Sequence, residues 1–298
     1  MIQPPYLKKG DKVGIVSPSR SITFEEMHPS IRVLQKFGLE VVLGSHVFSR
    51  HNQFAGSDDH RAKDFQQMLD DDSIRAILCS RGGYGSIRIV DKLDFSRFLL
   101  HPKWIVGYSD ITVFHSHILE CFGIETLHAT MPKNIQSDLP DESVRTMINA
   151  LFGKPLAYTQ NRSPLSRDGY AEGILAGGNL SIIYNLMGSV SELNTKGKIL
   201  FLEDIDEYLY HIDRMMMNLK RAGKLSSLAG LIVGGMTKMN DNEIPFGKTP
   251  DEIIAGAVAE FKYPVCFDFS AGHVDRNQAL ILGRKIKLSV GKQISVTF

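Results

Sequence analysis

Short apolar segments alternate with amphipathic segments along the first half of the chain. Apolar runs of four or five residues without polar alternation predict strands that are buried on both faces. The predicted strands are 13–17, 40–43, 76–80, 104–107 and 124–128. The segments between them have helical spacing. This βαβα alternation predicts an α/β fold with a parallel, doubly wound sheet.

Capping and stop residues delimit the helices of this half. Thr23 and Glu26 have the spacing of a capping box, and Gly38 is a plausible C-terminal stop. Further helices are predicted from Ser57 to about Leu69, and over 86–93, 110–122 and 141–152.

The pattern changes after residue 153. Residues 154–170 hold two prolines and several Ser, Asn, Asp and Gly residues, which is typical of a linker. Beyond it, expected strands at 171–175, 199–202 and 231–233 alternate with expected helices at 180–187, 209–222 and 250–261, and 278–298 predicts two or three strands. We therefore expect an N-terminal domain over 1–153, a linker over 154–170 and a smaller C-terminal domain over 171–298.

Composition narrows the class of protein without naming its chemistry. The 298 residues include 43% hydrophobic residues, enough for a full core, and 34 Lys+Arg against 33 Asp+Glu give a net charge of +1. This balance argues against a nucleic-acid partner bound through its phosphates. The three cysteines form no C-x-x-C pair, so neither a disulfide framework nor a thiolate zinc site is expected. With no signal-like or membrane-length apolar run, we expect a soluble, cytoplasmic protein with no membrane partner.

Ligands of open α/β sheets bind at the carboxyl ends of the strands, and two loops of the first half follow predicted strands. In the loop 80–86, Gly82 and Gly83 would let backbone N–H groups approach an anion, although the loop matches neither nucleotide-binding fingerprint. Ser109 lies at a strand-to-helix corner, like a nucleophile elbow, with the N–H of Asp110 beside it. The alternatives are a tight turn for the glycines and a helix N-cap for Ser109.

An acid and a base are predicted in the second half. Glu203 directly follows the apolar run 199–202 and could orient a histidine, whereas an acidic helix N-terminus explains the carboxylates after it better. His273 lies in a small-residue loop after an expected strand at 265–269, although a surface histidine is the alternative. The order Ser109, Glu203, His273 is nucleophile, acid and base. No histidine spacing supports a metal site.

Taken together, these segments resemble the LD-carboxypeptidases, the muramoyltetrapeptide carboxypeptidase family of serine peptidases. The similarity spans nearly the whole chain and rests on segments that occur in family order. They are 16–19 (VSPS), 81–85 (RGGYG), 107–110 (GYSD), 177–180 (GGNL), 202–205 (LEDI), 210–214 (YHIDR) and 272–273 (GH).

The resemblance implies a catalytic triad of Ser109, Glu203 and His273. It implies an N-terminal domain like that of class I glutamine amidotransferases and a C-terminal domain of swivelling β/α type. The implied reaction releases terminal D-alanine from a murein tetrapeptide by cleaving the bond to the L-centre of meso-diaminopimelate, during cytoplasmic peptidoglycan recycling. The family resemblance also implies a homodimer, and no cofactor or metal.

Further roles follow for residues of the matching segments. The oxyanion would lie between the N–H of Asp110 and that of Gly82 or Gly83. Arg81 would bind a substrate carboxylate or form a structural ion pair, and Tyr84 and Asn179 are further candidates for substrate binding. One alternative function is the microcin-C immunity type of serine hydrolase, which cleaves acyl-sulfamoyl adenylates and peptide–nucleotide conjugates. The other is a module that binds a small ligand without turnover.

Overall fold

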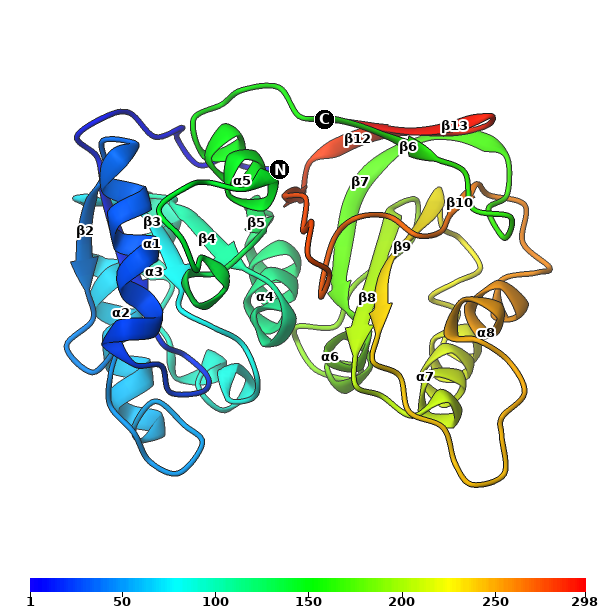
Figure 1. Cartoon of the computed structure of the whole chain (residues 1–298), viewed down its shortest axis with the longest axis horizontal. Coiled ribbons are helices and arrows are strands. Elements are labelled where there is room, and N and C mark those ends of the chain that lie inside the picture. The colour runs from blue at the N-terminus through cyan, green and yellow to red at the C-terminus, as the bar shows by residue number, and fades with distance from the viewer.

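The computed structural model describes residues 1–298, and the chain forms two α/β halves that lie side by side (Figure 1). Each half is built on its own sheet, one of six strands and one of seven. No helix combines the length and the apolarity that spanning a membrane requires.

The first sheet is the predicted parallel, doubly wound one, with an added edge strand. Its parallel strands are β1 (Lys12–Val16), β2 (Glu40–Leu43), β3 (Ile74–Cys79), β4 (Trp104–Gly107) and β5 (Thr126–His128). Their order in the sheet is β5-β4-β3-β1-β2. Because the order reverses between β1 and β3, a crevice opens at the carboxyl ends of these strands.

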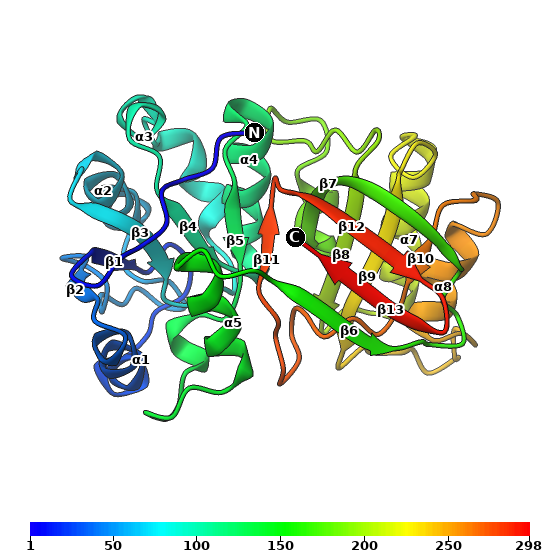
Figure 2. The same cartoon turned by 90° about the horizontal axis from the view of Figure 1, so that it is seen from above.

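Helices cover both faces of this sheet. Figure 2 shows α1 (Phe24–Lys36) and α5 (Glu142–Leu151) on one face, and α2 (Asp58–Asp70), α3 (Ser96–Leu100) and α4 (Thr112–Phe122) on the other. The capping box of Thr23 and Glu26 is confirmed, and Ser57 caps α2 as predicted.

One predicted helix is wrong. Residues 86–93 form two short 3-10 turns, η1 (Ser86–Arg88) and η2 (Val90–Lys92). Tertiary hydrogen bonds hold the start of this segment: the N–H of Ser86 donates to the buried carboxylate of Asp110, and the carbonyl of Gly85 accepts from Arg61. These contacts fix the segment in a conformation that its local sequence does not predict.

The second sheet has the order β10-β9-β8-β7-β12-β13-β6. The four strands β7 (Gly169–Asn179), β8 (Ile199–Ile205), β9 (Gly230–Thr237) and β10 (Val265–Cys266) run parallel. The antiparallel strands are β12 (Lys285–Val290), β13 (Gln293–Thr297) and β6 (Ala157–Asn161).

Burial differs between the two kinds of strand as their environments require. The first six residues of β8 are buried without alternation, since apolar side chains of α6 (Leu180–Asn185), α7 (Leu209–Arg221) and α8 (Pro250–Ala257) share a core with those of the parallel strands. In β12 buried and exposed residues alternate strictly, because one face of the antiparallel part is open to water.

The two halves are joined more intimately than a linker would allow. The segment 154–170, expected to be a linker, carries β6 and the start of β7. The strand β11 (Leu280–Leu282), from the C-terminal segment, pairs antiparallel with β5 at the edge of the first sheet. One apolar cluster of 40 buried residues runs through both halves. The chain therefore crosses between the sheets more than once.

Candidate active site

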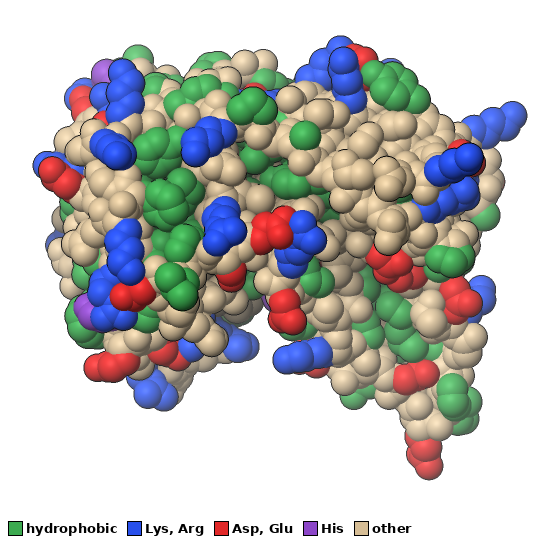
Figure 3. Space-filling view, turned by 45° about the horizontal axis from the view of Figure 1, so that its top comes forward, with side chains coloured by type: hydrophobic (Ala, Val, Ile, Leu, Met, Phe, Trp, Pro, Cys, Tyr) green, Lys and Arg blue, Asp and Glu red, His purple; other side chains and the backbone are tan.

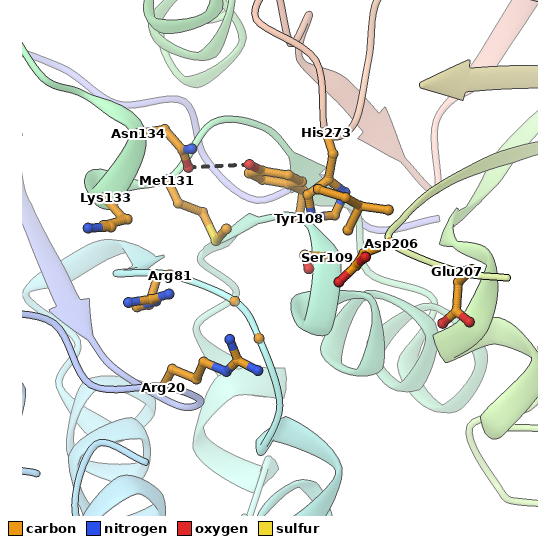
Figure 4. Close-up of a pocket in the computed structure, with 13 residues that line it drawn as sticks. Arg20, Arg81, Tyr108, Ser109, Met131, Lys133, Asn134, Asp206, Glu207 and His273 are labelled. Atoms are coloured by element: carbon orange, nitrogen blue, oxygen red, sulfur yellow. Dashed lines mark hydrogen bonds between the residues drawn. The ribbon is translucent and has the colours of Figure 1, made fainter. Parts of the chain in front are cut away.

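A cavity of about 490 Å³ lies where the two halves meet. Figure 3 shows the surface indented between the halves, and Figure 4 shows the lining side chains converging from both. The lining residues are Arg20, Arg81, Gly82, Gly83, Tyr108, Ser109, Met131, Lys133, Asn134, Ile205, Asp206, Glu207 and His273. The first nine follow strands of the first sheet, and the last four belong to the second half.

Ser109 occupies a strained turn between β4 and α4. It opens the 3-10 turn η3 (Ser109–Ile111) and has a left-handed φ of 65°, which a residue with a side chain adopts only when its surroundings impose it. Ile111 packs tightly over Gly107, because a Cβ added to Gly107 would lie only 2.8 Å from the Cγ1 of Ile111. The hydroxyl of Ser109 makes no capping hydrogen bond, which excludes the N-cap alternative. The turn presents Ser109 to the cavity.

The glycine loop after β3 lies directly against this serine. A Cβ at Gly82 would lie 2.9 Å from the Cβ of Ser109 and 3.0 Å from its Oγ. At Gly83, where φ is +119°, a Cβ would meet the side chain of Arg20. The backbone N–H groups of both glycines donate no hydrogen bond within the protein. They are therefore available to an oxygen bound beside Ser109.

Glu203 and His273 form a buried hydrogen-bonded pair. Glu203 lies within β8 and is fully buried, which excludes the alternative of a helix N-terminus. Its Oε2 accepts hydrogen bonds from the Nδ1 of His273, at 2.6 Å, and from the backbone N–H of His273, at 3.2 Å. The close approach requires Gly272, where a Cβ would lie 2.6 Å from the Glu203 carboxylate. The loop thus places the imidazole with its Nδ1 committed to the carboxylate.

The surroundings of His273 favour its protonated form. Burial lowers the pKa of His273, but the charge of Glu203 and the hydrogen bond that the ring donates to it outweigh burial and leave the pKa above its usual value. The ring of Tyr108 packs edge-on against the imidazole, with 4.8 Å between ring centroids. Burial, with a smaller contribution from Glu203, raises the pKa of Tyr108 to about 12, so the phenol stays neutral.

Ser109 and His273 line the same cavity, but no hydrogen bond joins them in this structure. The acid–base pair is assembled, whereas the contact to the serine is not made. Catalytic hydrogen bonds of this kind often tighten only when substrate is bound.

Cationic side chains form one wall of the cavity. Arg81 donates to the carbonyl of Ser21 at 3.1 Å and forms no ion pair, which excludes the structural ion pair as its role. Arg20 has neither an ion pair nor a side-chain hydrogen bond, while Lys133 is paired with Glu26. Arg20 was not among the site residues predicted from the sequence. The available signal for a ligand-binding role was the position of Arg20 after the first predicted strand. This position lies next to the glycine loop, at the reversal of strand order.

Two residues predicted to bind substrate lie outside this cavity. Tyr84 is 43% exposed and its ring packs against that of Phe54. Asn179 is buried: its Oδ1 caps α6, and its Nδ2 donates to Asp204 at 2.9 Å. Asn179 therefore has a structural role, because it holds the residue that follows Glu203 in β8.

Asp204 is itself buried rather than part of an exposed acidic cluster. It also accepts the backbone N–H of Ser181 at 2.8 Å. Burial, followed by the charge of Glu203, raises the pKa of Asp204 to about 7. No group of three or more His, Cys, Asp or Glu side chains in the structure is arranged to hold a metal ion.

Comparison with protein families places both halves of the chain. Residues 13–129 match the LD-carboxypeptidase N-terminal domain, and residues 172–288 match the LD-carboxypeptidase C-terminal domain. A probable murein peptide carboxypeptidase of Bacillus subtilis is 34% identical over 301 aligned positions, which cover 99% of this chain and 93% of that protein.

Solved structures share the whole architecture. The muramoyltetrapeptide carboxypeptidase of Oxalobacter formigenes superposes with a TM-score of 0.86 and 25% identity, over 96% of this chain and 98% of that one. The microcin C7 self-immunity protein MccF, in complex with aspartyl sulfamoyl adenosine, also has a TM-score of 0.86, with 22% identity over 98% of this chain and 97% of that one. At that identity the second likeness concerns the fold alone.

Proposed function

This chain belongs to the LD-carboxypeptidase family of peptidases, and we propose that it is a serine carboxypeptidase that releases the terminal D-alanine of a murein tetrapeptide. The bond cleaved joins the L-centre of the third residue, meso-diaminopimelate, to D-alanine. The names of its relatives support this substrate. The observation that carries the mechanism is the buried Glu203–His273 pair facing the strained Ser109 across one cavity.

The chemistry begins with proton transfer from the serine. The Nε2 of His273 accepts the proton of Ser109 as its Oγ attacks the carbonyl carbon. Glu203 keeps the Nδ1 of the ring protonated, so that Nε2 is the free base, and it stabilises the imidazolium that forms. The imidazolium then protonates the departing amine of D-alanine. Attack of water on the acyl-enzyme, with His273 again as base, restores Ser109.

Backbone N–H groups would stabilise the oxyanion of each tetrahedral intermediate. Gly82 is favoured over Gly83 as one donor, because a Cβ at Gly82 would lie beside both the Oγ of Ser109 and, at 3.4 Å, the N of Asp110. The N–H of Asp110 is the second donor. A single donor of this kind contributes about 3 kcal/mol to the transition state.

The unpaired guanidinium groups of Arg20 and Arg81 would bind the carboxylate of the terminal D-alanine. Guanidinium groups bind carboxylates through paired, charge-assisted hydrogen bonds, and neither arginine is neutralised by an acid of the protein. This contact explains why the enzyme would act at a free C-terminus.

The test is D-alanine release from L-alanyl-γ-D-glutamyl-meso-diaminopimelyl-D-alanine by the wild-type protein and by Ser109→Ala. We expect turnover by the wild type and its loss in the variant, with an unchanged melting temperature. Undiminished turnover by Ser109→Ala would refute the assignment of the nucleophile. A wild type that releases no D-alanine would refute the proposed substrate.

The same assay should also be run with a peptide–nucleotide substrate, to test the alternative function. In the cavity a nucleobase could stack only on the ring of Tyr108, and that ring is packed edge-on against His273. The single tryptophan, Trp104, is buried in β4 and donates its indole N–H to the carbonyl of Pro5. We therefore expect hydrolysis of aspartyl sulfamoyl adenosine to be much slower than that of the tetrapeptide.

We also propose that the protein acts in the cytoplasm, on peptides recovered during peptidoglycan recycling, as a homodimer. The resemblance to the family supports all three statements. The unpaired state of Cys79, Cys121 and Cys266 is in keeping with a reducing compartment. Cell fractionation and sedimentation of the purified protein test the location and the assembly.

A further inference from the structure

The wall of the cavity opposite Arg20 and Arg81 carries its own charges, at the ends of β8 and β9. Asp206 follows β8 and Lys238 follows β9, and the last paired residues of these parallel strands, Ile205 and Thr237, are register partners. Asp206 and Lys238 therefore occupy corresponding positions at one edge of the sheet. Both have left-handed backbones, with φ of 61° and 52°.

Each of these two charges is free to meet a ligand. Asp206 accepts a hydrogen bond from the side chain of Asn240 at 2.9 Å, and neither Asp206 nor Lys238 forms an ion pair, even with the other. The neighbouring carboxylate, Glu207, differs in this respect, because its Oε2 lies 2.6 Å from the Nδ1 of His211. Asp206 is thus the unpaired acid of this wall.

The two residues line adjoining spaces that meet at the catalytic base. Asp206 lines the cavity of Ser109, and Lys238 lines a neighbouring cavity of about 690 Å³. Tyr108, Asn134, Ile205 and His273 line both. Figure 4 shows the carboxylate of Asp206 pointing into the first cavity, on the other side of Ser109 from Arg20 and Arg81.

We propose that Asp206 and Lys238 together recognise the side chain of the residue on the acyl side of the cleaved bond. With the D-alanine carboxylate on Arg20 and Arg81, the acyl residue extends past Ser109 toward the opposite wall. In the substrate proposed above, on which this inference rests, that side chain ends in an ammonium and a carboxylate on one carbon. Asp206 binds the ammonium, and Lys238 binds the carboxylate.

With these roles, Asp206 and Lys238 would distinguish a diaminopimelate peptide from a lysine peptide, two substrates that differ by one carboxylate. A lysine side chain supplies the ammonium for Asp206 but nothing for Lys238. Asp206 therefore contributes to binding of both diaminopimelate and lysine peptides, whereas Lys238 contributes only to the first. The preference for diaminopimelate over lysine would depend on Lys238.

The experiment compares kcat/KM for the tetrapeptide with meso-diaminopimelate and for its counterpart with L-lysine as third residue. For Lys238→Gln we expect about a tenfold loss with the diaminopimelate peptide and no change with the lysine peptide. For Asp206→Asn we expect a loss of about tenfold or more with both, and asparagine is well tolerated in a left-handed backbone. Lys292→Gln and Asp213→Asn, at charges that form no ion pair and line neither cavity, are the matched controls and should change neither rate.

An unchanged ratio of the two rates in Lys238→Gln would overturn the role of Lys238. Unchanged rates in Asp206→Asn would overturn that of Asp206. A wild type inactive on both peptides would instead refute the proposed function, so the two failures are distinguishable.

Discussion

The Nδ1 of His273 lies 2.6 Å from the Oε2 of Glu203, while the other carboxylate oxygen of Glu203 is buried without a hydrogen-bond partner. All the hydrogen bonding of this carboxylate is thus directed at the imidazole and at the backbone N–H of the same residue. Burying a charge is costly unless it is paired, and here His273 supplies every partner that the carboxylate has. This geometry is suited to holding one tautomer of His273 and to stabilising its cation.

The first prediction concerns Glu203→Gln. Glutamine keeps the volume of the side chain but removes the charge and allows the wrong tautomer of His273. We expect kcat to fall by about 10³–10⁴-fold, as for the corresponding change in other triads. Steady-state kinetics on the tetrapeptide measures the effect, and circular dichroism verifies the fold. A loss below tenfold would show that His273 does not depend on this carboxylate.

The second prediction is a pH dependence. His273 must be neutral to accept the proton of Ser109, and the charge of Glu203 together with its hydrogen bond to the ring outweighs burial and raises the pKa of His273 above 6.5. The profile of kcat/KM should therefore rise with pH, with a midpoint above 6.5. In Glu203→Gln the charge of Glu203 is gone, burial remains, and the charge of Asp204 is the smaller raising cause that is left. The midpoint of the residual activity should therefore move to lower pH. A midpoint that stays in place would contradict the coupling of the two residues.

The third prediction concerns Gly272. In Gly272→Ala the new Cβ, at a φ of +97°, would lie 2.6 Å from the carboxylate of Glu203 and displace the His273 loop. We expect at least a hundredfold loss of kcat/KM. The matched control is Gly197→Ala, at a φ of +68° with no atom within 4 Å of the added Cβ. The control should lose about 1–2 kcal/mol of stability and no activity.

Urea unfolding separates the backbone effect from the steric one. Gly272→Ala should be less stable than the control by about 1–3 kcal/mol, because its methyl group is also overpacked. Full activity in Gly272→Ala would mean that the loop can move without cost, and the pairing of His273 with Glu203 would not be required.

The fourth prediction concerns the cationic wall. Arg20→Met and Arg81→Met should each lower kcat/KM for the free-acid tetrapeptide by about 10–100-fold, the value of a charge-assisted hydrogen bond. With a tetrapeptide amide as substrate the variants should match the wild type, since the carboxylate is absent. Arg50→Met, at an exposed arginine without an ion pair, should behave as the wild type with both peptides. Equal losses of kcat/KM with the free acid and with the amide would show that these arginines do not bind the terminal carboxylate.

Local pattern was informative where local interactions decide the structure. Parallel strands buried on both faces read as unbroken apolar runs, so β4 has the bounds that were predicted. The edge strand β2, which is only partly buried, also has its predicted bounds. Caps such as that of Thr23 were equally predictable, because a capping box involves residues three apart. The strand β6, which lies in the expected linker, could not be found in this way, and neither could the partner of β11, although β11 falls within the strands expected over 278–298. Their partners, β13 and β5, are distant in the sequence, and only the packing of the two halves brings each pair together.

The local sequence was enough to locate the parallel strands and to place Ser109 and Glu203 at or near strand ends, because periodicity and turn residues act locally. It was not enough for His273, because the strand expected at 265–269 ends at Cys266 and a longer loop carries the histidine. Which of these side chains meet depends on how distant segments of the chain pack. Glu203 and His273 are 70 residues apart, and their hydrogen bond depends on the register of β8 and on a glycine that lets the loop approach. The same is true of Arg20, which reaches the cavity by packing over Gly83. Asn179 shows the reverse, since its side chain caps α6 and donates to Asp204 and does not line the cavity.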